Sequence, residues 1–307
     1  MRTKSLPLPA IILILFVTLP VSARQKIIID TDPAIGYFLR DVDDGLALAI
    51  ALNSPELEIL GITTIYGNHT QAKTYKKALE ILKEAKSQVP VYRGAKKPGD
   101  FSLTPASRFI KSAVLAHPGE ITIIAIGPLT NLASAIKSEP EVGKNLKSVI
   151  SMGGALQAKF LGLPPGAFDL NWGSDVKAVQ LVVNSVPNFV MISTDLCLKV
   201  VFTKEKYQKL KASAPFLRDY LARGIKSWLA FNRMIFQTEQ GRGFFPWDTL
   251  AVIYLLEPEV FCPNPIQIEI KPRKIQGVKI TTGKGTPINA PLELNRERFW
   301  EIFFERI

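Results

Sequence analysis

The chain has 307 residues, of which 47% are hydrophobic and 21% are charged, so it is neither disordered nor collagen-like and suits one large α/β domain or two small ones. Its two histidines are few for a zinc site or a Ser-His-Asp triad. The net charge of +11 is spread along the chain, so we expect a solvated basic surface and no nucleic-acid partner.

Residues 1–23 have the pattern of a secretory signal peptide. Arg2 and Lys4 precede an apolar run, which ends in small residues before position 24. The run is shorter than the ~20 residues of a spanning helix, so we expect no membrane anchor after its removal. The prediction is an exported domain, residues 24–307, in the periplasm or outside the cell. Export permits a disulfide, but the sequence leaves open whether Cys197 and Cys262 pair.

Buried strand-like runs alternate with helical patterns along the rest of the chain. In chain order we expect strand 26–30, helix 43–52, strand 57–66, helix 70–86, strand 120–127, helix 129–137, strand 147–152, helix 174–184 and strand 188–194. A helical stretch with a break near Pro215 follows over 203–236, then extended segments after Pro258 and a helix over 295–307. This order predicts a single α/β domain with a mostly parallel, open central sheet and helices on both faces.

Five carboxylates fall within fifteen positions at the first strand–helix junction: Asp30, Asp32, Asp41, Asp43 and Asp44. A helix cap needs one carboxylate, not five, and like charges this close repel one another. A bound divalent cation offsets that repulsion far better than a helix N-terminus does. Ligands that are all oxygens favour Ca²⁺ or Mg²⁺ over zinc.

Other expected strand ends and helix starts carry further candidate residues: Asn68, Ile126, Asp169, Asn171 and Asp248. Ligands of a parallel α/β sheet bind beyond the carboxyl ends of its strands. Each residue alone is a weak signal, because turns and helix caps use the same residue types. Together they place carboxylates and amides where a site belongs.

These motifs resemble the inosine–uridine-preferring nucleoside hydrolase family. Its members open with a strand ending Asp-x-Asp-Pro-Gly and a helix beginning Asp-Asp-Ala. Here the corresponding runs are 30–34 and, after an insertion, 43–48, and the resemblance extends to Trp247 and Asp248. It implies a Rossmann-like nucleoside hydrolase fold, Ca²⁺ as cofactor, a dimer or tetramer, and hydrolysis of the N-glycosidic bond of ribonucleosides to ribose and free base.

The resemblance also assigns roles to residues. Asp32, Asp44 and Asp248 would bind Ca²⁺ through their carboxylates and Ile126 through its backbone carbonyl. Asp32 would also be the general base that takes a proton from the attacking water. Asp30 would support the ligands from behind.

Ribose hydroxyls would be held by Asp43, Asn68, Asp169 and Asn171, where Asp169 replaces the usual glutamate of the family. Nearby carboxylates also suit the reaction, because breaking an N-ribosidic bond builds positive charge on the anomeric carbon.

Several residues depart from the family pattern around the base. Trp247 stands where many members have a histidine, and the Trp-Asp pair resembles the purine-specific branch, in which an indole stacks on the base. Phe101 is the candidate for a second aromatic residue, and Arg242 for a contact with the base or a 5′ substituent. His69 follows a strand end, where we favour a capping or solvated role over a role in the site.

The opening loop has Ala34 for the usual glycine and an insertion over 35–42. The alignment of Asp43 and Asp44 with the family therefore depends on the run 43–48, and Asp41 is the competitor if the register differs. Leu163 stands near a missing asparagine, so we expect one ribose contact to be lost.

Two other functions are compatible with parts of the sequence. A metal-dependent ribose- or nucleoside-binding protein without catalysis would explain the changed loops, although it would not need a general base. A phosphatase with Asp30 as nucleophile and Asp32 as acid is disfavoured by Pro33 and by the lack of a suitable phosphate-binding lysine. Release of free ribose or of inorganic phosphate separates these chemistries.

Overall fold

The computed structural model describes residues 23–212, 217–274 and 276–307. The predicted signal peptide and the predicted break near Pro215 lie outside these residues, so both remain predictions. Within the described ranges, no helix is long and apolar enough to cross a membrane.

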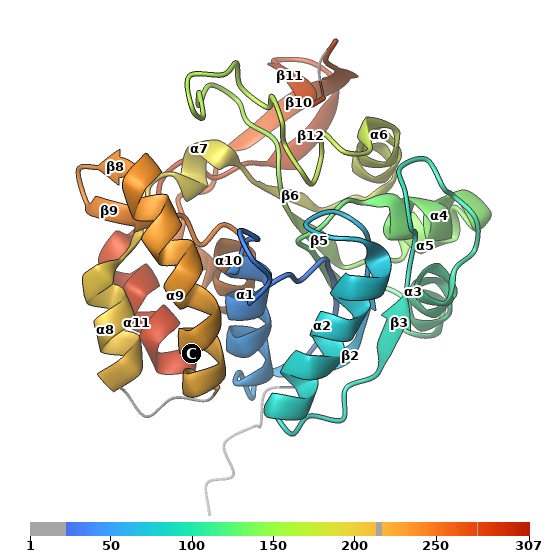
Figure 1. Ribbon diagram of the computed structural model, residues 1–307. Helices are drawn as coiled ribbons and strands as arrows, with labels where there is room; N and C mark the ends of the chain where they lie inside the picture. Colours follow the sequence, from blue (N-terminus) through green and yellow to red (C-terminus); the bar gives the residue numbers. More distant parts are fainter. Residues whose placement is uncertain (1–22, 213–216, 275) are drawn as a thin grey trace, which may run out of the picture.

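A nine-stranded sheet forms the centre of the molecule, with the order β11-β10-β12-β6-β5-β4-β1-β2-β3 (Figure 1). The strands are β1 Gln25–Thr31, β2 Leu57–Thr64, β3 Val91–Arg93, β4 Thr122–Ala125, β5 Ser148–Met152, β6 Phe189–Ile192, β10 Pro265–Pro272, β11 Val278–Thr282 and β12 Thr286–Asn289. The pairs from β3 across to β12 are parallel, and β10 is antiparallel to both of its neighbours. The predicted open, mostly parallel sheet is confirmed.

Helices cover both faces of the sheet (Figure 1). They are α1 Asp43–Leu52, α2 Gln71–Glu84, α3 Pro105–Ala116, α4 Thr130–Ser138, α5 Glu141–Lys144, α6 Val176–Ser185, α7 Thr194–Cys197, α8 Lys204–Ala212, α9 Arg218–Ile235, α10 Thr249–Leu256 and α11 Arg296–Arg306. Strand β1 shows how the faces are separated, because successive side chains of a strand point to opposite sides. Ile27 and Ile29 belong to the core under α1, α10 and α11, whereas Ile28 belongs to the core under α3, α4 and α6.

The strand order positions the site. From β1 the chain proceeds to β2 and β3 on one side, and β4, β5 and β6 extend the sheet on the other side. The order therefore reverses between β1 and β4, and ligands of open α/β sheets bind in the crevice at such a point. Asp32 directly follows β1 and Ile126 directly follows β4, so both stand at this crevice.

Several elements were not predicted. Helix α3, the three-residue strand β3, and the small sheet of β7 Phe202–Thr203, β9 Gly241–Phe244 and β8 Gln237–Thr238 are additions to the expected pattern. Strands of two to four residues are too short for a period of two to stand out. Helix α3 did carry a signal, since Thr104 and Ser107 form a capping box around Pro105.

Candidate active site

The first turn of α1 is fixed against the ends of β1 and β2 by Asp44. Its carboxylate accepts hydrogen bonds from the Thr31 hydroxyl, from the backbone N–H of Asp32 at 3.0 Å and from the Asn68 side chain at 3.1 Å. These donors belong to two separate segments, the end of β1 and the loop after β2, that meet at one carboxylate. Asp44 therefore connects the loops that follow the neighbouring strands β1 and β2.

Asp32 presents one carboxylate oxygen that has no partner. Its Oδ2 accepts the backbone N–H of Asn68 at 2.5 Å, whereas its Oδ1 is buried without a hydrogen bond. The preceding residue in that loop is Gly67, with φ of 152°, and a Cβ there would collide with the Asp32 carboxylate. A glycine is thus required for this close approach. A buried oxygen without a partner is costly, which indicates that a positively charged or hydrogen-bonding group belongs there.

Asp30 lies behind this arrangement. Its Oδ1 accepts hydrogen bonds from Thr63 at 2.7 Å and Asn131 at 2.8 Å, and its Oδ2 has no partner. Burial raises the pKa of Asp30 to about 7. The side chain is thus held by hydrogen bonds from β2 and α4, and it does not line the cavity.

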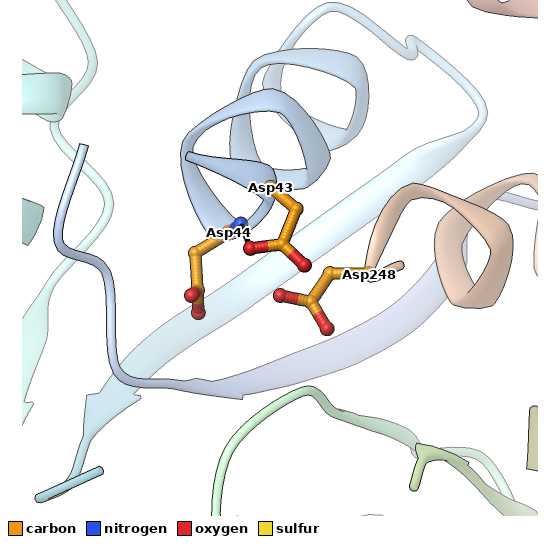
Figure 2. A group of neighbouring side chains, drawn as sticks. All are labelled: Asp43, Asp44 and Asp248. Atoms are coloured by element: carbon orange, nitrogen blue, oxygen red, sulfur yellow. Dashed lines mark hydrogen bonds between the residues drawn. The ribbon is translucent and has the colours of Figure 1, made fainter. Parts of the chain in front are cut away.

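Three carboxylates converge beside Asp32: Asp43 and Asp44 from α1 and Asp248 from the start of α10. One oxygen of each lies within 4.8 Å of the others. Figure 2 shows their carboxylates turned toward a shared space between the two helices. Burial raises the pKa of Asp44 to about 7. Burial, followed by the charges of neighbouring carboxylates, raises the pKa values of Asp32, Asp43 and Asp248 well above their ordinary range.

This donor set fits a hard divalent cation. Asp43, Asp44 and Asp248 offer only carboxylate oxygens, and the repulsion among these three charges would be relieved by a cation. The cluster contains Asp44 and Asp248, two of the predicted ligands, and Asp43, which was predicted to bind ribose. Asp32, the third predicted carboxylate ligand, is not a member of this cluster. The fourth predicted ligand, the carbonyl of Ile126, accepts a hydrogen bond from Asn171 at 3.4 Å.

A cavity of about 440 Å³ opens above the carboxylates. Its lining contains the predicted site residues Asp43, Asn68, Ile126, Asp169, Asn171, Trp247 and Asp248. The structure therefore brings together residues that are separated by up to about two hundred positions in the chain. Its size lies within the range of small-molecule sites.

Aromatic side chains form one wall of the cavity. The Trp247 ring contacts Phe245 at a centroid distance of 5.0 Å and Phe160 edge-on at 5.3 Å, and Phe160 stacks on Phe236 at 5.2 Å. All four line the cavity. The site thus has an acidic floor and an aromatic wall.

Two predicted contacts with the base are not found. Arg242 is exposed on β9 and donates a hydrogen bond to the carbonyl of Arg233 at 3.2 Å, and it does not line the cavity. Burial increases along β9, from exposed Arg242 to buried Gly243 and Phe244, so Arg242 lies at the exposed end of the strand. Phe101 packs in the core against α3 and α4 and lies under Lys137.

The structure also places His69 and the two cysteines. His69 accepts the backbone N–H of Thr70 at 2.8 Å and does not line the cavity, which agrees with the capping role that we favoured. Cys197 is buried, Cys262 is exposed, and both are free. No disulfide joins them.

The contribution of α9 to the cavity was not predicted from the sequence. Trp228, Phe231, Asn232 and Ile235 line it, and their spacing of three and four residues puts them on one face of the helix. That periodic stripe was a usable signal for a buried face, but not for what the face contacts. Asp41, the predicted alternative to Asp43, lines the cavity too, and burial raises its pKa to about 6.

The loop between β5 and α6 is held by two carboxylates. Asp169 accepts the backbone N–H groups of Gly154, Asn171, Trp172 and Gly173. Asp195 of α7 accepts those of Leu156, Gln157 and Ala158 at 2.7, 2.9 and 2.7 Å. Since Ala158 is two residues before Phe160, Asp195 positions the part of the loop that enters the aromatic wall.

We expect Asp195→Ala to raise KM for a nucleoside about tenfold, because small displacements of a binding wall are costly. Asp195→Asn keeps one acceptor oxygen and should recover part of the loss. Steady-state kinetics of both variants measure the effect, with Asp219→Ala, an exposed carboxylate of α9, as the control. An unchanged KM in Asp195→Ala would show that the loop is held by its other contacts.

A carboxylate cluster under a cavity at the switch point of an open sheet is typical of α/β enzymes that act on small polar molecules. The family model described as "Inosine-uridine preferring nucleoside hydrolase" matches residues 27–301. The chain belongs to this family and is a nucleoside N-ribohydrolase, an enzyme that hydrolyses ribonucleosides at the N-glycosyl bond.

Among its relatives, "Probable uridine nucleosidase 2" of Arabidopsis thaliana is 28% identical over 267 residues, which cover 78% of this chain and 79% of the relative. A solved plant nucleoside hydrolase has a TM-score of 0.81 at 23% identity, covering 92% of this chain and 98% of that one. A purine-preferring ribonucleoside hydrolase from Gardnerella vaginalis has a TM-score of 0.79 at 21% identity, with the same coverage. These structural similarities show the fold, and the names include both uridine and purine specificities.

Proposed function

We propose that this enzyme is a Ca²⁺-dependent ribonucleoside hydrolase with a preference for purines. The observation that carries the base preference is the Trp247 indole in the cavity wall, next in sequence to Asp248 of the acidic floor. A purine offers a larger flat face for stacking than a pyrimidine. The all-oxygen donor set supports Ca²⁺, whose large shell takes several carboxylates.

In this proposal the acidic floor binds the sugar. Asp43, Asn68 and Asn171 line the cavity and offer oxygen acceptors and amide donors for ribose hydroxyls. When bound, the cation would orient vicinal hydroxyls and lower the pKa of a water. The unpartnered Oδ1 of Asp32 would accept a proton from the attacking water. The surrounding carboxylates would stabilise positive charge at the anomeric carbon.

The test is release of free ribose from inosine, adenosine, guanosine, uridine and cytidine, with Ca²⁺ and with a chelator. Release that depends on Ca²⁺ and is faster with purines supports the proposal. Release that is fastest with uridine would contradict the base preference. Tight nucleoside binding without release would favour the non-catalytic binding protein.

We expect Trp247→Leu to lower kcat/KM for inosine about tenfold more than for uridine, because a lost stacking contact is worth about 0.5–1.5 kcal/mol beyond lost contact area. Leucine keeps apolar contacts with Phe160 and Phe245 and limits damage to the wall. Trp300→Leu, in α11 and outside the cavity, is the matched control. Equal losses for the two substrates would assign Trp247 to packing alone.

The proposed location and assembly of the enzyme have separate tests. We propose export, on the pattern of residues 1–23, and a homodimer or homotetramer, on the family resemblance. Mass spectrometry of the secreted protein should find an N-terminus at Arg24, and light scattering should give two or four times the chain mass. A full-length cellular protein or a monomer would contradict them.

A further inference from the structure

The cavity opens to solvent between large hydrophobic side chains. Leu161, Phe168 and Leu170 of the β5–α6 loop and Ile235 at the end of α9 all line it. They are nevertheless 60%, 54%, 50% and 45% exposed, respectively. We call these four residues the apolar rim. Single exposed hydrophobic residues are ordinary, but four around one opening mark a binding surface.

The backbone of the rim is strained. Leu161 and Phe168 have φ of 53° and 55°, in the left-handed region that bulky residues rarely adopt. The same loop has Gly162 and Gly166 at φ of 73°, where no such strain arises. Strained conformations of this kind cluster at sites that bind ligands. The rim therefore carries large apolar side chains at a conformational cost.

The loop is also anchored. Phe168 donates its backbone N–H to the carbonyl of Gln276 at 2.9 Å, and Arg273 donates through Nε to the carbonyl of Pro165 at 3.0 Å. Gly166 accepts the backbone N–H of Val278 at 2.9 Å. The turn between β10 and β11 thus holds the loop in place. The rim side chains of this loop are therefore exposed although the loop backbone is hydrogen-bonded to its neighbours.

The position of the rim selects the part of a ligand that would reach it. Carboxylates and amides on the floor suit the ribose, and Trp247 and Phe160 on the wall suit the base. Any substituent of the nucleoside that extends past the ribose-binding floor and the base-binding wall would project toward the opening of the cavity. The exocyclic groups and the 5′-hydroxyl of common nucleosides are polar and gain nothing from four aliphatic or aromatic side chains, whereas an apolar group would be removed from water there.

We infer that the preferred substrates are nucleosides that carry an apolar substituent, on the base or on the 5′ carbon, and that the apolar rim binds it. This inference rests on the proposed function, because it assumes that the floor holds the ribose. It adds a substrate class that ribose and base binding do not require. The enzyme would cleave the same N-glycosidic bond in these substrates as in unmodified nucleosides. Water adds to the anomeric carbon, and the base leaves with a proton. The leaving base carries the substituent in a base-modified nucleoside and is unsubstituted in a 5′-modified one.

The test compares adenosine with N6-benzyladenosine and with 5′-deoxy-5′-(methylthio)adenosine. We measure kcat/KM with the wild type, and Kd by calorimetry with the Asp32→Asn variant, which isolates binding from turnover. The expected result is an advantage on the order of tenfold over adenosine in Kd and in kcat/KM for at least one substituted nucleoside. Which of the two gains shows whether the base or the 5′ carbon carries the group.

Variants locate the effect. Ile235→Asn and Phe168→Asn should reduce the advantage severalfold, and asparagine tolerates the left-handed backbone at position 168. Met234→Asn is the matched control, since Met234 is 73% exposed, adjacent to Ile235 and outside the cavity lining. It should leave all constants unchanged.

Equal or weaker binding of both substituted nucleosides would overturn the inference, as would an advantage that survives in Ile235→Asn and Phe168→Asn. Failure of the proposed function looks different. In that case no nucleoside releases ribose, while the Kd values still decide whether the rim favours apolar groups.

Discussion

Asp32→Asn is expected to lower kcat for ribonucleoside hydrolysis by about 10³-fold, within the range of about 10²–10⁴ for loss of a positioned general base. The physical reason is the state of its two oxygens. Oδ2 is used by the backbone N–H of Asn68, and Oδ1 is buried without a partner. The free oxygen is the acceptor that a reacting water needs, and an amide at this position no longer accepts its proton.

The thermal stability of the Asp32→Asn variant distinguishes loss of the general base from misfolding. Burial, followed by repulsion from Asp44, raises the pKa of Asp32, so the charged form is unfavourable in the folded protein without a cation. Asp32→Asn removes that charge, and we expect its Tm in chelator to equal or exceed that of the wild type. Asp100→Asn, which removes an exposed carboxylate hydrogen-bonded to Ser102, is the activity control. A variant with normal kcat would exclude Asp32 as the base.

Removal of divalent cations is expected to abolish ribose release and to make stability depend strongly on pH. Burial raises the pKa of Asp30 and of Asp44 to about 7, against an ordinary value of 3.8. The folded protein therefore binds protons more tightly than the unfolded chain. Its stability is highest below the ordinary carboxyl pKa and is lost as the pH rises from about 4 through about 7.

In chelator we therefore expect Tm to fall between pH 5 and pH 8 by at least about 5 °C, since several carboxyls act together. Saturating Ca²⁺ should raise Tm more at pH 8 than at pH 5, because it binds the ionised cluster. Thermal unfolding under these four conditions measures both effects. Asp248→Asn removes one member of the cluster and should weaken the response to Ca²⁺. A Tm in chelator that rises toward pH 8 would contradict this account.

Local sequence signals were sufficient for the central sheet with its helices and for the carboxylates at the first strand–helix junction. Alternating strand and helix periods predicted the parallel sheet, because each element must bury its own apolar face. Helix 43–52 begins and ends where its pattern predicted. Asp32 and Asp44 lie on either side of one strand–helix connection, so their proximity follows from the local chain path.

Other features depended on tertiary structure. Asp248 reaches Asp43 and Asp44 only because α10 packs beside α1, across about two hundred residues of chain. The helical stretch over 203–236 was predicted from its pattern, but only packing decided that one face of α9 completes the cavity wall. Arg242 is close to Trp247 in sequence, which suggested a shared site, but it lies at the exposed end of β9 and donates a hydrogen bond to the carbonyl of Arg233.

The sheet, its helices and the chemical type of the site could therefore be predicted from the sequence, since periodicity and residue chemistry are local properties. Only the tertiary structure decided which oxygens remain unpartnered, which aromatic rings form the wall and which apolar side chains surround the opening. These depend on contacts between distant segments, whose relative placement is set by packing of the whole core. The apolar rim is the clearest case, because it joins a loop after β5 to the end of α9.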